Sequence, residues 1–153
     1  MTEFVLVHGG WVGGWYWRRV SPLLEAAGHR VLVPTLTGLG ERAHLCSLGV
    51  NLDTHIEDVA NVLTFEDLHN VVLVGHSYGG IVITGVAEHA AERLAHLCYL
   101  DAFVPSNGQA LADFVGPAMV ADAREKAKLS HDGSRVPMPF PPRRGWGPKG
   151  SRC

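Results

Sequence analysis

The sequence predicts an α/β fold, a parallel sheet with helices on both faces. Short apolar runs rich in β-forming residues alternate along the chain with stretches in which apolar residues recur at helical spacing. The runs are apolar at successive positions, which is typical of strands buried on both faces of a parallel sheet. We therefore expect right-handed crossovers between strands, and we find no internal repeat.

The first third of the chain predicts two strands and one helix. The run at residues 4–7 is a strand that ends in a glycine loop. Residues 15–27 carry apolar side chains at helical spacing, and Gly28 ends that helix. The second strand, at residues 30–34, ends at a proline. The stretch 35–51 is rich in Gly and Thr and predicts a loop.

The next part of the chain repeats this alternation. Asp53 or Thr54 is expected to cap a helix whose apolar residues share one face. A third buried strand follows at residues 71–74, and a helical stretch at 81–91 leads to a fourth strand at 97–100. Together these elements predict βαβ units.

The character of the chain changes after residue 105. Residues 110–129 predict one or two helices with loose periodicity. We assign residues 1–135 to one partial domain and residues 136–153 to a tail. Five of the nine prolines and four basic residues fall in this tail, without an acidic residue. The tail is expected to be disordered, or to be a frame-shifted end after Pro141.

The charge balance excludes several classes of partner. Lys and Arg number 13 against 15 Asp and Glu, so a net charge of -2 offers no attraction to nucleic acid or to an anionic membrane surface. No apolar run approaches the roughly 20 residues that a membrane span needs, and we recognise no signal peptide. The 3 cysteines are too few for a disulfide scaffold or a zinc site. We expect a cytoplasmic protein without metal or cofactor, since phosphate-binding and dinucleotide motifs are also absent.

The motif Gly-x-Ser-x-Gly at residues 75–79 carries the strongest chemical signal. It lies between a predicted strand and a predicted helix, the context of a nucleophile elbow. A turn this sharp leaves no room for side chains at Gly75 and Gly79, and it lifts the Ser77 hydroxyl above the sheet edge. The backbone N–H of Tyr78 would favour negative charge there. The alternative is a glycine-rich turn without catalytic consequence.

A second glycine loop follows the first strand. Acyl transfer needs a second N–H donor for the oxyanion, and the loop after a neighbouring strand supplies it. We select Gly10 as this donor, with Trp11 as the next candidate. Trp11 is expected to pack in the loop and core, or to line the pocket. His8 is expected to brace the loop by hydrogen bonds, with the role of catalytic base as the alternative.

These motifs resemble those of the α/β-hydrolase superfamily, in the branch of methylesterases, hydroxynitrile lyases and their bacterial esterase relatives. The resemblance rests on residues 4–11 (FVLVHGGW), 13–15 (GGW), 22–29 (PLLEAAGH) and 75–80 (GHSYGG). It covers residues 2–105 and makes residues 105–135 the start of a cap region.

The resemblance implies a serine hydrolase that acts on small-molecule carboxylic esters. Ser77 would be the nucleophile, and the backbone N–H groups of Gly10 and Tyr78 would form the oxyanion hole. Trp11, His76 and Tyr78 would contact the substrate, and the loop at residues 35–42 would lie near the pocket. A homodimer is left open.

A catalytic serine needs a histidine that takes its proton and an acid that orients the histidine. The sequence indicates these two partners less clearly than it indicates Ser77. In the resembled family the acid and the histidine follow the serine in that order, and the histidine follows the last strand. Asp101 ends a strand at the catalytic edge and is a candidate acid. His89 and His96 are expected on the surface, and His131 lies in a turn-like stretch.

We therefore expect the N-terminal portion of an α/β-hydrolase fold, without the late strands and truncated at the C-terminus. Such a chain would have weak or no esterase activity, because the base that activates the serine is missing. The alternatives are a non-catalytic ligand-binding relative, an inert fragment and, lower in rank, a cyanohydrin lyase.

Overall fold

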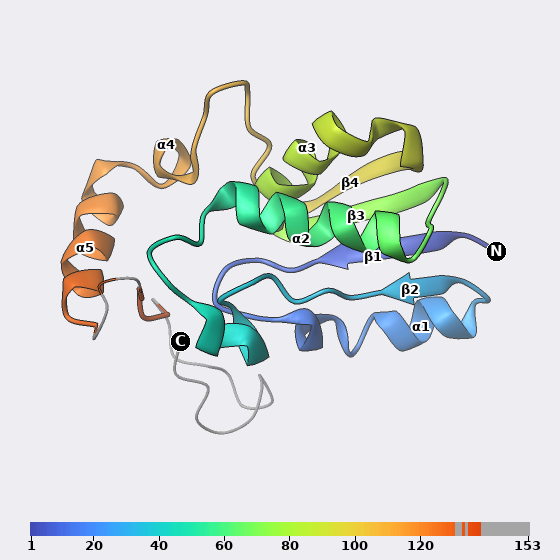
Figure 1. The fold of residues 1–153 in the computed structure, drawn as a ribbon, viewed down its shortest axis with the longest axis horizontal. Helices are drawn as coiled ribbons and strands as arrows, with labels where there is room; N and C mark the ends of the chain where they lie inside the picture. The colour runs from blue at the N-terminus through green and yellow to red at the C-terminus, as the bar shows by residue number, and fades with distance from the viewer. Residues whose placement is uncertain (131–132, 134, 139–153) are drawn as a thin grey trace.

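Four parallel strands form the sheet in the computed structural model, which describes residues 1–130, 133 and 135–138. The strands are β1 (Glu3–Val7), β2 (Arg30–Leu32), β3 (Val71–Ser77) and β4 (Leu94–Ala102). Their order across the sheet is β2-β1-β3-β4 (Figure 1). All three pairings are parallel, which confirms the predicted α/β architecture.

Helices cover both faces of this sheet, as predicted. α2 (Leu52–Phe65) and α3 (Gly79–Ala90) lie on one face, and the short α1 (Ser21–Ala26) lies on the other (Figure 1). α4 (Leu111–Val115) and α5 (Pro117–Lys128) stand beyond the carboxyl ends of the strands. Among the described residues, none of the helices combines the length and the apolar character that crossing a membrane requires.

The apolar core is divided by the sheet into two clusters. The larger cluster packs α2 and α3 against β1 and β3, with Val59, Leu63, Leu73, Val82 and Ile83 fully buried. The smaller one lies on the other face around Leu6, Trp17 and Val74. The larger cluster fixes α3 on β3, so it holds the turn between them in place.

Two helix predictions and one loop prediction need correction. The helix expected over residues 15–27 is divided into a 3-10 turn (Gly14–Trp17) and α1, because Pro22 has no N–H and fits only the first turn of a helix. The cap of α2 is Asn51 instead of Asp53 or Thr54: the Asn51 side chain accepts a hydrogen bond from the Thr54 N–H. The expected loop 35–51 contains a 3-10 segment, Gly40–Leu45.

The fourth strand is longer and more exposed than its sequence indicates. β4 begins at Leu94, so His96 lies within the strand instead of before it. Cys98, which the apolar run predicts to be buried, is exposed. Its side chain shares the sheet face of Val74, its register partner in β3. Among the described residues β4 pairs only with β3.

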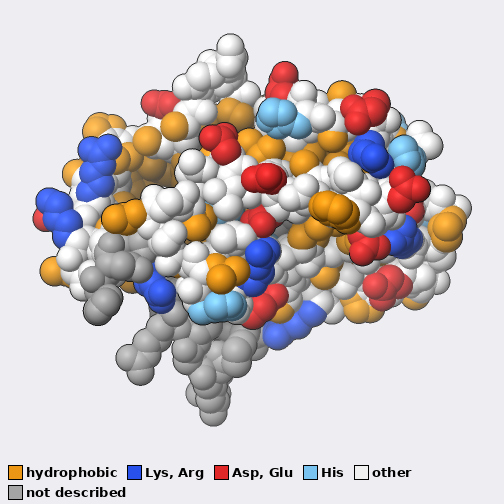
Figure 2. All heavy atoms as spheres, in the orientation of Figure 1, with side chains coloured by type: hydrophobic (Ala, Val, Ile, Leu, Met, Phe, Trp, Pro, Cys, Tyr) orange, Lys and Arg blue, Asp and Glu red, His pale blue; other side chains and the backbone are white. Residues whose placement is uncertain are grey.

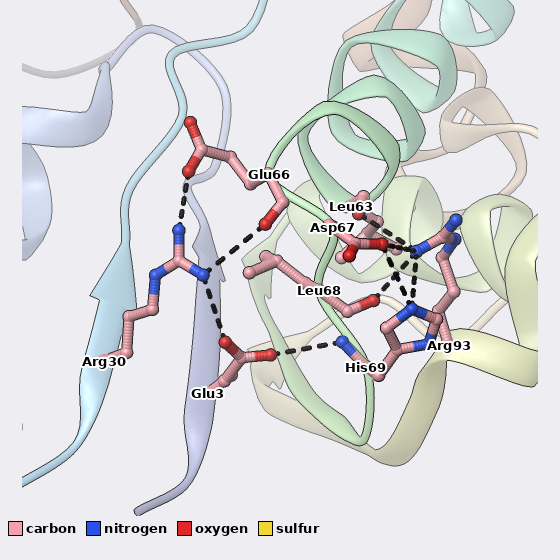
Figure 3. Close-up of polar contacts among 8 residues, drawn as sticks. All are labelled: Glu3, Arg30, Leu63, Glu66, Asp67, Leu68, His69 and Arg93. Atoms are coloured by element: carbon pink, nitrogen blue, oxygen red, sulfur yellow. Dashed lines mark hydrogen bonds and ion pairs between the residues drawn. The ribbon is translucent and has the colours of Figure 1, made fainter.

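A polar network ties the amino ends of the strands together. Arg30 of β2 bonds to Glu3 of β1 and to Glu66 after α2 (Figure 3). The Arg93 guanidinium donates to the carbonyl oxygens of Leu63 and Leu68. This network lies at the amino ends of the strands, and the nucleophile elbow lies at their carboxyl ends. The charged pairs are partly exposed, so each contributes little stability.

Candidate active site

The turn between β3 and α3 has the geometry of a nucleophile elbow. Ser77 has a φ of 53°, in the left-handed region that a residue with a side chain rarely adopts. β3 ends at this residue, and Tyr78 is the N-cap of α3. The turn is held by the Phe103 N–H, which donates to the Ser77 carbonyl over 3.1 Å. Strain of this kind persists only where the surrounding structure enforces it.

The glycines beside the serine are required by close backbone approach. A Cβ added at Gly75 would lie 2.5 Å from the Gly79 oxygen and 2.9 Å from the Gly80 nitrogen. One added at Gly79 would lie 2.7 Å from the Val7 oxygen and 2.8 Å from the His8 oxygen. All four distances are shorter than those that real Cβ atoms show. The elbow therefore excludes other residues at Gly75 and Gly79, as the motif predicts.

A cavity of about 480 Å³ opens at the carboxyl ends of the strands and includes Ser77 in its wall. Gly10, Trp11 and Tyr78 line the same cavity. Most of the remaining wall is apolar and includes Leu39, Ala43, Phe103, Leu111, Val115 and Met119. In the space-filling view, hydrophobic side chains surround a hollow near α4 and α5 (Figure 2). The structure thus brings four of the predicted site residues together.

The loop after β1 lies directly on the elbow. A Cβ added at Gly9 would lie 2.9 Å from the Ser77 Cβ. Gly10, the next residue, lines the cavity, and a Cβ there would meet nothing within 4 Å. Tyr78 begins α3, a helix of 12 residues whose amino end attracts negative charge. Gly10 and Tyr78 therefore line the cavity with Ser77 from two different segments of the chain.

His8 braces the β1 loop, as expected. Its Nδ1 donates to the Gly9 carbonyl over 2.7 Å, and its Nε2 accepts from the Leu36 N–H over 3.1 Å. Burial lowers its pKa from 6.5 to about 4, because the charged form would lose its hydration. Both ring nitrogens are engaged, so His8 is unsuited to be the catalytic base.

Trp11 follows the proposed oxyanion donor and lines the cavity. Its φ is 62°, and its indole Nε1 donates to the Val136 carbonyl over 2.8 Å. This bond connects the β1 loop to the segment after α5, across 125 positions of the chain. Trp11 therefore contributes to the cavity wall and also holds the segment that closes one side of it.

His76 does not lie where the sequence places it. It is absent from the cavity wall, and its ring stacks on Tyr16 at a centroid distance of 5.0 Å. Alternate residues of a strand face opposite sides, so His76 shares the face of Val74 and the smaller cluster. Burial lowers its pKa, with Asp101 acting in the opposite direction. His76 therefore lies away from this cavity wall, and its contact with substrate stays a prediction.

The candidate acid and bases are also not brought to the cavity. Asp101 lies in β4 with a φ of 44°, is exposed, and is absent from the cavity wall. His89 and His96 are exposed, as predicted. His131 lies outside the described residues, as does the tail after Pro141.

His55 is a polar residue of the cavity wall that no sequence motif marks. It lies in α2, buried, and lines the cavity with Ser77 and Tyr78. Its Nδ1 lies 2.9 Å from the Tyr78 hydroxyl, and its Nε2 lies 2.9 Å from the Thr37 carbonyl. A signal existed in the sequence, because His55 stands beside Ile56 and four residues before Val59 on the apolar face of this helix.

Further hydrogen bonds connect α2, the helix of His55, to the loop after β2. Thr37 donates to Asp58 through its N–H and its hydroxyl, over 2.6 and 2.8 Å. Arg42 pairs with Asp58 and donates to the Thr35 carbonyl. The loop is thus fixed to α2, and its residues Gly38 and Leu39 line the cavity. This placement agrees with the expected position of residues 35–42.

The described residues offer no group of three or more His, Cys, Asp or Glu side chains that is suited to hold a metal ion. The residues that line the cavity include four with polar or charged side chains that bear on its chemistry: His55, Ser77, Tyr78 and Arg135.

Comparison with known proteins identifies the family. The chain matches the Alpha/beta hydrolase family over residues 4–151. It belongs to this family, as the elbow and the order of the strands indicate.

Individual relatives are esterases and hydrolases by name. A carbendazim hydrolyzing esterase of Nocardioides sp. is 54% identical over 119 residues, which cover 78% of this chain and 49% of the relative. A pyrethroid hydrolase of Sphingobium wenxiniae is 36% identical over 119 residues, covering 76% of this chain and 41% of that protein.

A solved structure extends the likeness along most of the chain. It is described as an extracellular alpha/beta-hydrolase from a Paenibacillus species that shares structural and functional homology with tobacco Salicylic Acid Binding Protein 2. The TM-score is 0.83 at 28% identity, covering 94% of this chain and 58% of that one. The chain spans about half the length of the curated relatives it matches.

Proposed function

We propose that this chain carries the nucleophile half of a serine esterase that cleaves small carboxylic esters. One observation carries the proposal: Ser77, at a positive φ on the elbow, lines an apolar cavity together with Gly10 and Tyr78. The esterase and hydrolase relatives support the same reaction class.

In this proposal the Ser77 Oγ attacks the ester carbonyl carbon. The carbonyl oxygen becomes an oxyanion, which accepts hydrogen bonds from the N–H groups of Gly10 and Tyr78. Collapse of the tetrahedral intermediate expels the alcohol and leaves an acyl group on Ser77. Water then attacks the acyl group and releases the acid. These steps need no cofactor.

The base that takes the serine proton is assigned to residues outside those described. Both nitrogens of His8 are engaged in bonds to backbone groups, and both nitrogens of His55 have partners as well. Asp101, His89 and His96 do not line the cavity. The chain described here therefore supplies nucleophile, oxyanion donors and pocket, and we expect weak turnover from these parts alone.

The substrate proposed for this pocket is a small carboxylic ester. Aliphatic and aromatic side chains from the β2 loop and from α4 and α5 form most of the wall, so an apolar acyl or alcohol group is favoured. The cytoplasmic location and the open question of a homodimer stay predictions from sequence.

Chemical rescue tests the proposal. Hydrolysis of 4-nitrophenyl acetate and butyrate is measured with and without added imidazole, which can act as a base that the described residues do not supply. We expect imidazole to raise the rate of the chain above that of imidazole alone, and Ser77→Ala to remove this increment, a loss of about 100-fold or more. Ser106→Ala, a serine in an exposed loop, should keep the increment.

Other outcomes separate the alternatives. An increment that survives Ser77→Ala would contradict the proposed nucleophile. Release of cyanide from mandelonitrile, without ester hydrolysis, would favour the cyanohydrin lyase. Retained ligand binding without any Ser77-dependent hydrolysis would favour the non-catalytic relative.

A further inference from the structure

The hydrogen bonds of His55 define which of its ring nitrogens carries the proton. Nε2 faces the Thr37 carbonyl oxygen over 2.9 Å, and a carbonyl oxygen can only accept. Nε2 must therefore hold a hydrogen. In the neutral ring Nδ1 is then a lone pair, so it accepts from the Tyr78 hydroxyl, 2.9 Å away.

This bond uses the only hydrogen of the Tyr78 hydroxyl. Burial raises the pKa of Tyr78 above its usual value of 10.0, so the phenol stays protonated. Its hydrogen points to His55, and the phenol oxygen keeps a lone pair for another partner. His55 and Tyr78, joined by this bond, both line the cavity with Ser77.

Few strong hydrogen-bond acceptors share the cavity wall. Apart from Ser77, His55 and Tyr78, its polar side chains are those of Trp11 and Arg135, which only donate, and Cys46, a weak acceptor. Leu39, Phe103, Leu111, Val115 and Met119 cannot pair with an N–H or O–H group of a ligand. A ligand donor that enters the cavity unpaired loses its bonds to water at a cost. An acceptor with a fixed orientation removes this cost for a ligand that places its donor correctly.

We propose that the Tyr78 hydroxyl, oriented by His55, is a specificity-determining acceptor that selects esters with an N–H or O–H group beside the scissile bond. That the ligand is an ester rests on the proposed function. Recognition of its N–H or O–H group does not require turnover. His55 acts here as a positioning residue, and the Tyr78 oxygen makes the ligand contact.

The test measures binding with two inert amides of similar shape. Benzamide has N–H donors, and N,N-dimethylbenzamide has none. Dissociation constants are measured at pH 8 for the chain, for Tyr78→Phe and for Tyr99→Phe. Tyr99 is a matched control, because its hydroxyl also bonds to a side chain, Thr84, and it does not line the cavity.

We expect the ratio of the two dissociation constants to favour benzamide more in the chain than in Tyr78→Phe, by about fivefold. Tyr99→Phe should keep the original ratio. Long-range proton–nitrogen NMR should also find the hydrogen of His55 on Nε2, with the signals assigned by their loss in His55→Gln. That readout depends on the tautomer and not on stability.

Three results would overturn the inference: a ratio that Tyr78→Phe leaves unchanged, binding of neither amide, or a His55 hydrogen on Nδ1. These results are independent of ester hydrolysis. Ser77-dependent hydrolysis without the amide preference would remove only this inference. The preference without Ser77-dependent hydrolysis would remove only the proposed function.

Discussion

Gly75→Ala should destabilise the fold by about 3 kcal/mol, because the new methyl group meets backbone and not flexible side chains. Its Cβ would lie 2.5 Å from the Gly79 oxygen, 2.7 Å from the Gly79 carbon and 2.9 Å from the Gly80 nitrogen. Relief requires the start of α3 to move away from β3, which also opens the larger core cluster. Urea denaturation followed by circular dichroism measures the change in the free energy of unfolding.

Gly49→Ala is the matched control for this substitution. A Cβ at Gly49 meets only the Ser47 Oγ, at 3.7 Å, an ordinary contact. Its free energy of unfolding should therefore lie within about 0.5 kcal/mol of the parent value. Equal stability of the two alanine variants would contradict the close packing assigned to the elbow.

Acid should destabilise the protein through His8 before most carboxylates titrate. The pKa of His8 is lowered by burial from 6.5 to about 4 in the folded state, so the unfolded chain binds this proton more readily. Its contribution to stability is complete above pH 6.5 and is lost as the pH falls toward 4. The shift corresponds to a loss of about 3 kcal/mol over this range.

The measurement is the free energy of unfolding from pH 7 to pH 4. His8→Gln should be less stable at pH 7 and should show a shallower fall. The exposed His89→Gln should keep the parent slope. If His8→Gln does not fold, the His8 ring signals of the parent protein still decide, because they should remain those of a neutral ring down to about pH 4. Protonation of folded His8 near pH 6.5 would contradict the assignment.

The parts of the fold that the sequence predicts are those defined by neighbouring residues. The apolar runs give the four strands, and the glycines of residues 75–80 give the elbow, because both depend on local spacing. The role of His8 as a brace follows from its place beside Gly9 and Gly10. These features are confirmed at residue level.

The missed features depend on contacts between distant segments. His55 reaches Tyr78 across 23 positions, and Trp11 reaches Val136 across 125. The resemblance places His76 at the substrate, but the alternation of β3 places its ring on Tyr16. Cys98 is exposed although its neighbours Leu97, Tyr99 and Leu100 form an apolar run, because that run does not show which elements cover the face of β4.

The role of Ser77 as nucleophile is tested most directly by mass spectrometry after treatment with a fluorophosphonate probe. We expect one phosphonyl group on Ser77, formed faster with added imidazole and absent from Ser77→Ala. The parent chain and the variant are first compared by circular dichroism, so that both are known to be folded. An adduct that persists in Ser77→Ala, or a folded parent chain that remains unlabelled with imidazole, would contradict the assignment.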